Sequence, residues 1–212
     1  MSRRISFFID GFNIYHSLKP YDTSSRRYLM HYNKYLWLNF MALAKRFTVK
    51  KDQLAEVFYF TALAYWRPAA KARHEVFISA LENEGVRVVK GNFKEKDRFC
   101  KFCGASYKYH EEKETDVNIA LHLLNEAYQN TYDKAILVTT DTDLVPAITM
   151  AKHHFPEKRF GVLFPIDRWS SELSSACDFW LKIQKKDLKK CQFPEKVHLP
   201  NGIILERPAT WV

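Results

Sequence analysis

The chain has 212 residues, which is enough for one substantial domain and barely enough for two. Its content of 47% hydrophobic and 27% charged residues is that of an ordinary soluble globular protein. The net charge of +9, from 33 Lys and Arg against 24 Asp and Glu, favours a polyanionic partner, and nucleic acid is the commonest one.

The sequence argues against secretion and against a membrane location. No stretch approaches the ~18 consecutive apolar residues of a membrane span. The first apolar run, residues 5–9, is too short for a signal peptide and is interrupted by Asp10. Four cysteines, two of them close together, fit a reducing compartment better than a disulfide scaffold. We therefore expect a cytoplasmic protein with no membrane partner.

Short apolar runs alternate with longer amphipathic segments along the chain. In order, strands are predicted at 5–9, 57–61, 86–89, 135–139 and 160–164, and helices at 35–47, 68–84, 116–129 and 144–153. Strands separated by helices imply βαβ crossovers, so the expected fold is an α/β protein with a mostly parallel sheet covered by helices on both faces. We expect one domain over residues 1–190, an insertion around 91–114, and an extended tail over 191–212.

Aspartates fall where two of the predicted strands end. Asp10 closes the first strand, and Asp141 and Asp143 follow the fourth. Parallel strands direct their carboxyl ends to one edge of the sheet, where ligands bind. Carboxylates that converge there repel one another unless a cation lies between them, and hard oxygen ligands select Mg²⁺ or Mn²⁺. Such a centre can polarise a phosphate and activate water, which are the requirements of phosphodiester hydrolysis.

Each aspartate also has a purely structural interpretation. Asp10 precedes Gly11 and suits a turn. Asp116 follows Thr115 and suits the first turn of a helix, and Asp143 suits the cap of the helix predicted to start at residue 144. Spacing alone leaves the structural and the catalytic interpretations balanced.

Three sequence blocks resemble the NYN domain family, a group of PIN-like nucleases that includes the LabA-type proteins. The first is Phe8-Ile9-Asp10-Gly11-Phe12-Asn13, which resembles D-G-x-N. The second runs over residues 112–120 and resembles E-K-x-x-D-V-x-[IL]-A, with Asp116 at its aspartate. The third runs over residues 139–146 and resembles S-G-D-S-D-[FL]-x-P, with Asp141 and Asp143 at its aspartates. The blocks occur in the family's order, and the resemblance covers roughly residues 4 to 165.

The resemblance implies a three-layer α/β/α sandwich and a metal-dependent endoribonuclease. Asp10, Asp116 and Asp141 would bind Mg²⁺ or Mn²⁺, and Asp143 would join them directly or through water. Asn13 would orient Asp10, a water or a phosphate oxygen. Thr139-Thr140 replaces the family's small Ser-Gly pair, which leaves less room for a phosphate but keeps two hydroxyls.

A second constellation lies between the third strand and the helix that carries Asp116. Cys100 and Cys103 form a C-x-x-C-G sequence, which is half of a structural zinc site, and His110 is a third candidate ligand. The fourth ligand would be Cys177, Cys191, Glu111 or a residue from a second copy in a homodimer. An exposed dithiol and the remnant of a lost zinc site are the alternatives.

The same stretch alternates cations with aromatic rings. Lys94, Lys96, Arg98 and Lys101 are candidates for contact with the phosphates of single-stranded RNA, with Phe93, Phe99, Tyr107 and Tyr109 available to stack on bases. Glu95 and Asp97 dilute the charge, and a solvated loop is the competing interpretation.

Two rival functions remain at the level of sequence. One is a non-catalytic RNA-binding module of the same fold, which the Thr139-Thr140 replacement favours. The other is a small-molecule phosphohydrolase, because Asp141-Thr142-Asp143 matches the D-x-D of haloacid-dehalogenase-type phosphatases. That motif normally ends the first strand rather than the fourth, which disfavours the second rival.

Overall fold

The computed structural model describes residues 2–19, 21–22, 27–28 and 32–211. Six strands form one parallel sheet in the order β10-β9-β8-β1-β4-β5. Their bounds are β1 Arg4–Asp10, β4 Gln53–Thr61, β5 Arg87–Lys90, β8 Lys134–Val138, β9 Arg159–Phe164 and β10 Phe179–Lys182. The chain builds outward from β1 to β5, then returns to β8 on the other side of β1 and builds outward again. The switch point of the topology therefore lies between β1 and β8, where ligands of open α/β sheets bind.

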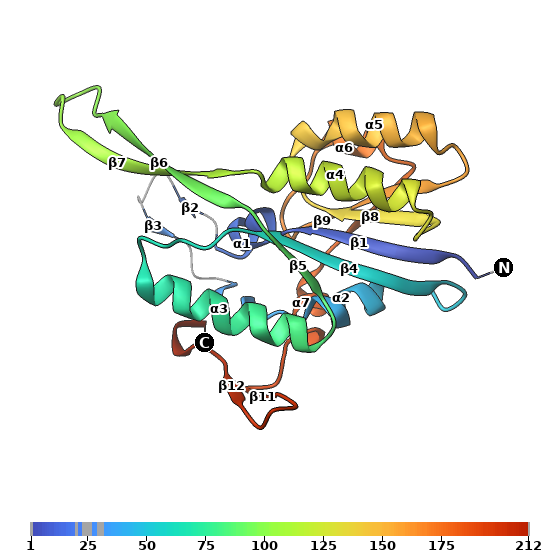
Figure 1. The fold of residues 1–212 in the computed structure, drawn as a ribbon, viewed down its shortest axis with the longest axis horizontal. Helices are drawn as coiled ribbons and strands as arrows, with labels where there is room; N and C mark the ends of the chain where they lie inside the picture. Colours follow the sequence, from blue (N-terminus) through green and yellow to red (C-terminus); the bar gives the residue numbers. More distant parts are fainter. Residues whose placement is uncertain (1, 20, 23–26, 29–31, 212) are drawn as a thin grey trace.

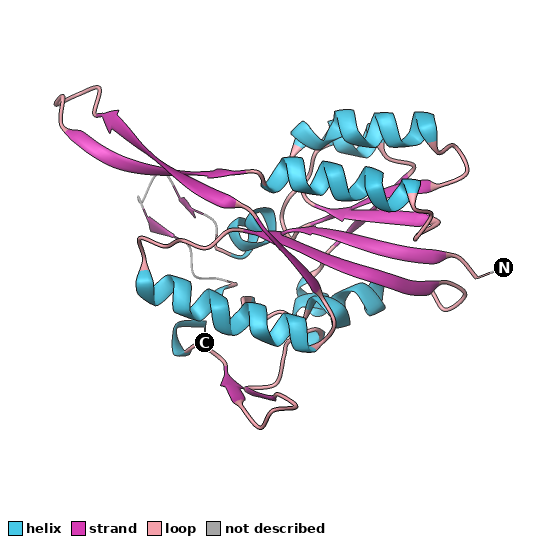
Figure 2. Ribbon diagram, in the orientation of Figure 1, coloured by secondary structure: helices cyan, strands magenta, loops and turns pink. Residues whose placement is uncertain are grey.

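Helices cover both faces of the sheet (Figure 2). On one face lie α1 Gly11–Leu18, α2 Phe40–Phe47, α3 Pro68–Asn83 and α7 Lys185–Lys190. On the other lie α4 Thr115–Tyr128, α5 Val145–His154 and α6 Ser171–Ala176. The expected three-layer α/β/α architecture is confirmed.

Each face of the sheet has its own apolar core because side chains alternate along β1. Phe7 and Ile9 pack with α1, α2 and α3, and Phe8 packs with α4 and α5. These three side chains are at most 1% exposed. A strand buried on both faces must be apolar at nearly every position, which is why residues 5–9 could be recognised from the sequence.

The helix predicted at 35–47 is wrong in its first half. The structure has a short 3-10 helix, η1 Asn33–Tyr35, and α2 begins only at Phe40. Asn39 caps α2 by accepting a hydrogen bond from the backbone N–H of Ala42 at 2.9 Å. Trp37 and Leu38 are fully buried before the helix begins, so their apolar character reflects core packing rather than helical periodicity.

Residues 91–114, expected as an irregular insertion, form a long antiparallel hairpin of β6 Asn92–Phe99 and β7 Ser106–Lys113. It projects away from the body of the protein (Figure 1). Its base meets α4, because β7 leads through Glu114 directly into that helix. Gly91 permits the close approach there, since a Cβ at this position would lie 2.7 Å from the carbonyl oxygen of Lys113.

The remaining elements are short. They are β2 Tyr21–Asp22, β3 Arg27–Tyr28, η2 Thr142–Leu144, β11 Lys196–His198, β12 Ile204–Glu206 and η3 Ala209–Trp211. After β11 and β12 the chain returns to the body, where Trp211 packs against Trp37 and Phe77. In the described part of the chain, no helix is long and apolar enough to cross a membrane.

Candidate metal centre

Three aspartates converge beside the switch point of the sheet. Asp10 is the last residue of β1, Asp141 follows β8, and Asp116 lies in the first turn of α4. One carboxylate oxygen from each lies within 4.8 Å of the others. Among the described residues, no other group of three or more Asp, Glu, His or Cys side chains is so close together. The parallel pairing of β1 with β8, which places Ile9 beside Val138, brings the first two to the same edge.

Asp10 is held rigidly although it is 2% exposed. Its Oδ1 accepts the backbone N–H of Asn13 at 3.0 Å, so Asp10 caps α1 as well as ending β1. Its Oδ2 accepts the Asn13 amide N–H at 2.5 Å and the Thr139 hydroxyl at 2.8 Å. Asp10 therefore does have the structural role of a helix cap, and the same hydrogen bonds hold its carboxylate beside Asp116 and Asp141.

Asn13 links Asp10 to the loop that carries Asp141. While its amide nitrogen donates to Asp10, its Oδ1 accepts the backbone N–H and the hydroxyl of Thr140, at 3.1 and 2.6 Å. Both ends of the amide are thus engaged by the protein. Asn13 is a positioning residue for Asp10.

Both threonine hydroxyls in the loop after β8 form hydrogen bonds within the protein. The Thr139 hydroxyl donates to Asp10 and also accepts the backbone N–H of Asp141 at 3.0 Å. Thr139 is fully buried, so its hydroxyl has no access to solvent as an alternative partner. The sequence identified the replacement of Ser-Gly at this point but not its role, because that role depends on the pairing of β1 with β8.

Asp143 lies apart from the other three acids. It is exposed, and its backbone N–H donates to Asp141 Oδ1 at 3.0 Å. Its side chain does not belong to the group formed by Asp10, Asp116 and Asp141. It is still near enough for its charge to contribute to the raised pKa of Asp116.

The negative charges of the three carboxylates repel one another. Partial burial, followed by the charges of Asp141 and Asp10, raises the pKa of Asp116 to about 6. Burial also raises the pKa of Asp10, although the hydrogen bonds from Asn13 and Thr139 oppose the change. A divalent cation would relieve this repulsion, and a set of three carboxylates is the donor chemistry of Mg²⁺ or Mn²⁺.

Glu112 positions Asp116, a role that sequence analysis missed. Its carboxylate accepts the backbone N–H of Thr115 at 3.0 Å and also the Thr115 hydroxyl. It thereby satisfies an N–H group at the start of α4 that has no partner within the helix. The matching motif already contained this glutamate, but only the left-handed turn at Glu114, with φ at 78°, brings it back to the helix start.

The three residues considered as zinc ligands do not meet within one chain. Cys100 and Cys103 lie at the tip of the hairpin, whereas His110 lies in β7 opposite Glu95. The His110 ring stacks on Trp66, with ring centres 3.7 Å apart, and its Nε2 is 3.3 Å from a Glu95 oxygen. Within one chain, the structure therefore does not bring His110 together with these cysteines.

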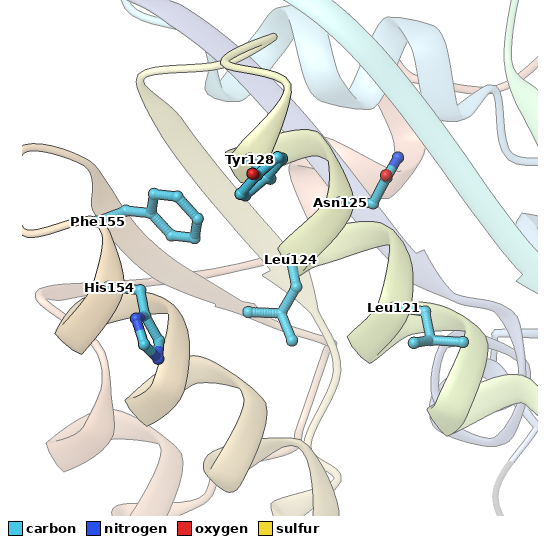
Figure 3. Close-up of a pocket in the computed structure, with 6 residues that line it drawn as sticks. All are labelled: Leu121, Leu124, Asn125, Tyr128, His154 and Phe155. Atoms are coloured by element: carbon cyan, nitrogen blue, oxygen red, sulfur yellow. The ribbon is translucent and has the colours of Figure 1, made fainter.

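A shallow apolar groove between α4 and α5 is separate from the acids (Figure 3). It is lined by Leu121, Leu124, Asn125, Tyr128, His154 and Phe155. None of these residues belongs to the aspartate group, which lies at the opposite, N-terminal end of α4. The groove therefore takes no part in the candidate metal centre.

We expect Asp116→Asn to stabilise the metal-free protein. The folded-state pKa of Asp116 is raised to about 6. The protonated carboxyl therefore stabilises the folded state below about pH 4, and this stabilisation is lost as the pH rises through 6. At pH 7.5 the variant should gain about 1 kcal/mol, after discounting for the half-exposed carboxyl. Thermal unfolding of metal-free samples from pH 4 to 8 measures this. Asp143→Asn is the control and should change little, and equal stabilisation by both substitutions would contradict the assigned repulsion.

We expect Thr139→Val to destabilise the protein by about 1–3 kcal/mol, because it leaves a buried oxygen of Asp10 and the N–H of Asp141 short of a partner. Chemical denaturation measures this change. The matched control is Thr149→Val, which removes an exposed helical hydroxyl bond to Val145 and should cost less than about 0.5 kcal/mol. Similar losses of stability in both variants would show that the buried hydrogen bonds of Thr139 stabilise the protein no more than an exposed hydroxyl bond does.

Comparisons with known proteins identify the family of the chain and support its fold. The 6-hydroxy-3-succinoylpyridine 3-monooxygenase HspA of Pseudomonas putida (strain DSM 28022 / S16) is 32% identical over 108 residues, covering 48% of this chain and 33% of that protein. This chain thus spans about a third of that relative's length. A solved protein of unknown function from Vibrio parahaemolyticus RIMD 2210633 superposes with a TM-score of 0.53 at 17% identity, covering 87% of this chain and 94% of the other. That likeness supports the fold alone. The model of the NYN domain matches residues 4–184, so the chain belongs to the NYN domain family, a PIN-like nuclease family.

Proposed function

We propose that the protein is a metal-dependent endoribonuclease that hydrolyses phosphodiester bonds of RNA. The observation that carries this proposal is the convergence of Asp10, Asp116 and Asp141 within 4.8 Å at the switch point of a sheet of a nuclease family. These three residues would hold Mg²⁺ or Mn²⁺. When bound, such an ion supplies charge neutralisation for the phosphate and activation of water.

The protein's own residues organise this centre before substrate arrives. Thr139 and Asn13 fix the two oxygens of Asp10, and Glu112 fixes the start of the helix that presents Asp116. Asp143 would act from outside the group, through water. The Thr139 hydroxyl bonds Asp10 directly, and the Thr140 hydroxyl bonds Asn13, which in turn bonds Asp10. Both threonines thus support the acidic group, and this favours a hydrolase over a non-catalytic binding module.

The monooxygenase named among the relatives acts on a small pyridine compound, and this raises an oxygenase as another candidate. The ligand set disfavours it. Non-haem iron oxygenases typically use two histidines and one carboxylate, whereas the described cluster consists of three carboxylates. An all-carboxylate centre favours phosphoryl chemistry with Mg²⁺ or Mn²⁺.

The hairpin provides a surface for single-stranded RNA. Residues paired directly across antiparallel strands project to the same side, so the register divides the hairpin into two faces. One face carries Lys94, Lys96, Arg98 and Lys113, with Glu111, Tyr107 and Tyr109. The opposite face carries the acids Glu95, Asp97 and Glu112, with Lys108 and His110. The acids that dilute the charge in the sequence therefore lie on the other side of the hairpin from the cations.

This cationic face has the chemistry of a single-strand binder. The Arg98 guanidinium lies 4.1 Å from the centre of the Tyr109 ring, and Tyr107 and Tyr109 are 48% and 39% exposed. Cations can contact phosphates while exposed rings stack on unpaired bases. Lys101 adds an exposed cation at the tip. Because β7 continues into α4, RNA held on this face would lead toward Asp116.

Cleavage of labelled single-stranded RNA tests the proposed reaction. Wild-type protein should cut in Mg²⁺ or Mn²⁺ and not in EDTA. Asp141→Asn should lower the rate at least 100-fold, because it removes a ligand charge needed only when the metal is bound. Asp97→Asn, which alters an exposed hairpin acid, is the control and should cut normally. Unchanged cleavage by Asp141→Asn would contradict the site, and RNA binding without any cleavage by the wild type would favour the binding module.

Neutralising two cations of the hairpin should weaken RNA binding without changing the chemistry. We expect Lys94→Gln with Arg98→Gln to lower affinity and to reduce the slope of log affinity against log salt by about 1.4, or ~0.7 for each RNA phosphate that is no longer neutralised. Fluorescence anisotropy in Ca²⁺ at several salt concentrations measures both quantities. Lys108→Gln, on the acidic face, should leave the slope unchanged. A larger effect from Lys108 than from the pair would place RNA on the other face.

A further inference from the structure

The tip of the hairpin holds two thiols in a turn suited to a metal. Cys100 directly follows β6, and Cys103 lies three residues later. The backbone N–H of Cys100 donates to the carbonyl oxygen of Ala105 at 2.8 Å, and that of Gly104 donates to the carbonyl oxygen of Cys100 at 2.9 Å. Gly104 has φ at 69°, which closes the turn at a position that glycine tolerates best. Both cysteines are free thiols.

Backbone N–H groups are directed at the sulfur of Cys100. It accepts hydrogen bonds from the backbone N–H groups of Phe102 and Cys103. The thiolate is the form that binds metals. A C-x-x-C-G turn with N–H groups directed at the first sulfur presents two ligands on one side, as half of a tetrahedral zinc site requires.

The other two ligands do not come from the same chain in the part that the structure describes. No His, Asp, Glu or third Cys of residues 2–19 and 32–211 completes a metal group with Cys100 and Cys103. His110 pairs with Glu95, five residues before Cys100, which places it about 16 Å away along the strand. Cys177 and Cys191 are buried in the two cores of the sheet.

The tip also exposes apolar rings that have no packing partner within the chain's cores. Phe102 is 101% exposed and Phe99 is 69% exposed, on either side of Cys100. A second hairpin tip would cover these rings, because the contact between two identical tips is self-complementary. The hairpin projects far enough from the body for two tips to meet (Figure 1). Lys101 lies between the two cysteines in the sequence and would offset part of the negative charge of a four-thiolate site.

We infer that two copies of the chain share one Zn²⁺ at their hairpin tips, with Cys100 and Cys103 of each copy as the four ligands. Four thiolates around one Zn²⁺ make a closed structural site, which is tetrahedral with Zn–S bonds of about 2.3 Å. Binding converts four thiols to thiolates and releases four protons to solvent. The site is independent of the aspartates, so failure of the nuclease proposal would leave it standing.

The test is the ratio of zinc to protein, measured together with the molecular mass. Full-length protein is reduced, stripped of metal, supplied with ZnSO₄, and examined by native mass spectrometry and by light scattering after size exclusion. We expect a dimer with one Zn²⁺, which returns to monomer with a chelator. Cys100→Ser and Cys103→Ser should each abolish zinc binding and dimerisation while leaving stabilisation by Mn²⁺ unchanged.

Two controls separate this site from its alternatives. His110→Ala should retain both zinc and the dimer, and Cys177→Ala should do the same. One Zn²⁺ per monomer, lost in His110→Ala, would overturn the inference in favour of a site within one chain. Protein that binds no zinc at equimolar ZnSO₄, with both thiols still titratable, would overturn it in favour of an exposed dithiol.

Discussion

The pairing of β1 with β8 is the constraint on which the site depends, because it brings two distant carboxylates to one edge of the sheet. Asp10 and Asp141 are far apart in the sequence, but the parallel register, which places Ile9 beside Val138, brings them together. The buried hydroxyl of Thr139 then joins the two strands' ends, donating to Asp10 and accepting from the N–H of Asp141. Hydrogen bonds of this kind offset part of the cost of burying a carboxylate, and a cation would offset the repulsion that remains.

The hairpin leads from this group of acids to the proposed RNA-binding face. Near its base, Glu112 caps the start of α4 and so positions Asp116. Along its middle, strand alternation places Lys94, Lys96 and Arg98 on one face and Glu95 and Asp97 on the other. Its tip carries the two thiols. One continuous element therefore links the proposed metal ligand Asp116, the proposed RNA contact and the proposed zinc bridge.

The sequence predicted the parts of the structure that local pattern determines. Continuous apolar runs identified β1 and β8, and strand ends identified Asp10 and Asp141. Asp116 required the family resemblance, because the position of a helix start relative to a sheet edge is set by tertiary packing. The hydrogen bonds of Thr139 and the separation of His110 from Cys100 depend on strand register, which the sequence did not reveal. The two faces of the hairpin could have been predicted from the sequence, since Lys94, Lys96 and Arg98 recur at every second position.

The most direct measurement is anomalous diffraction from crystals grown with Mn²⁺ and a short single-stranded RNA that resists cleavage. The account predicts an anomalous peak about 2.1 Å from an oxygen of each of Asp10, Asp116 and Asp141, with an RNA phosphate beside it. A peak elsewhere, or none at this cluster in millimolar Mn²⁺, would contradict the central claim that these three carboxylates form the catalytic metal centre.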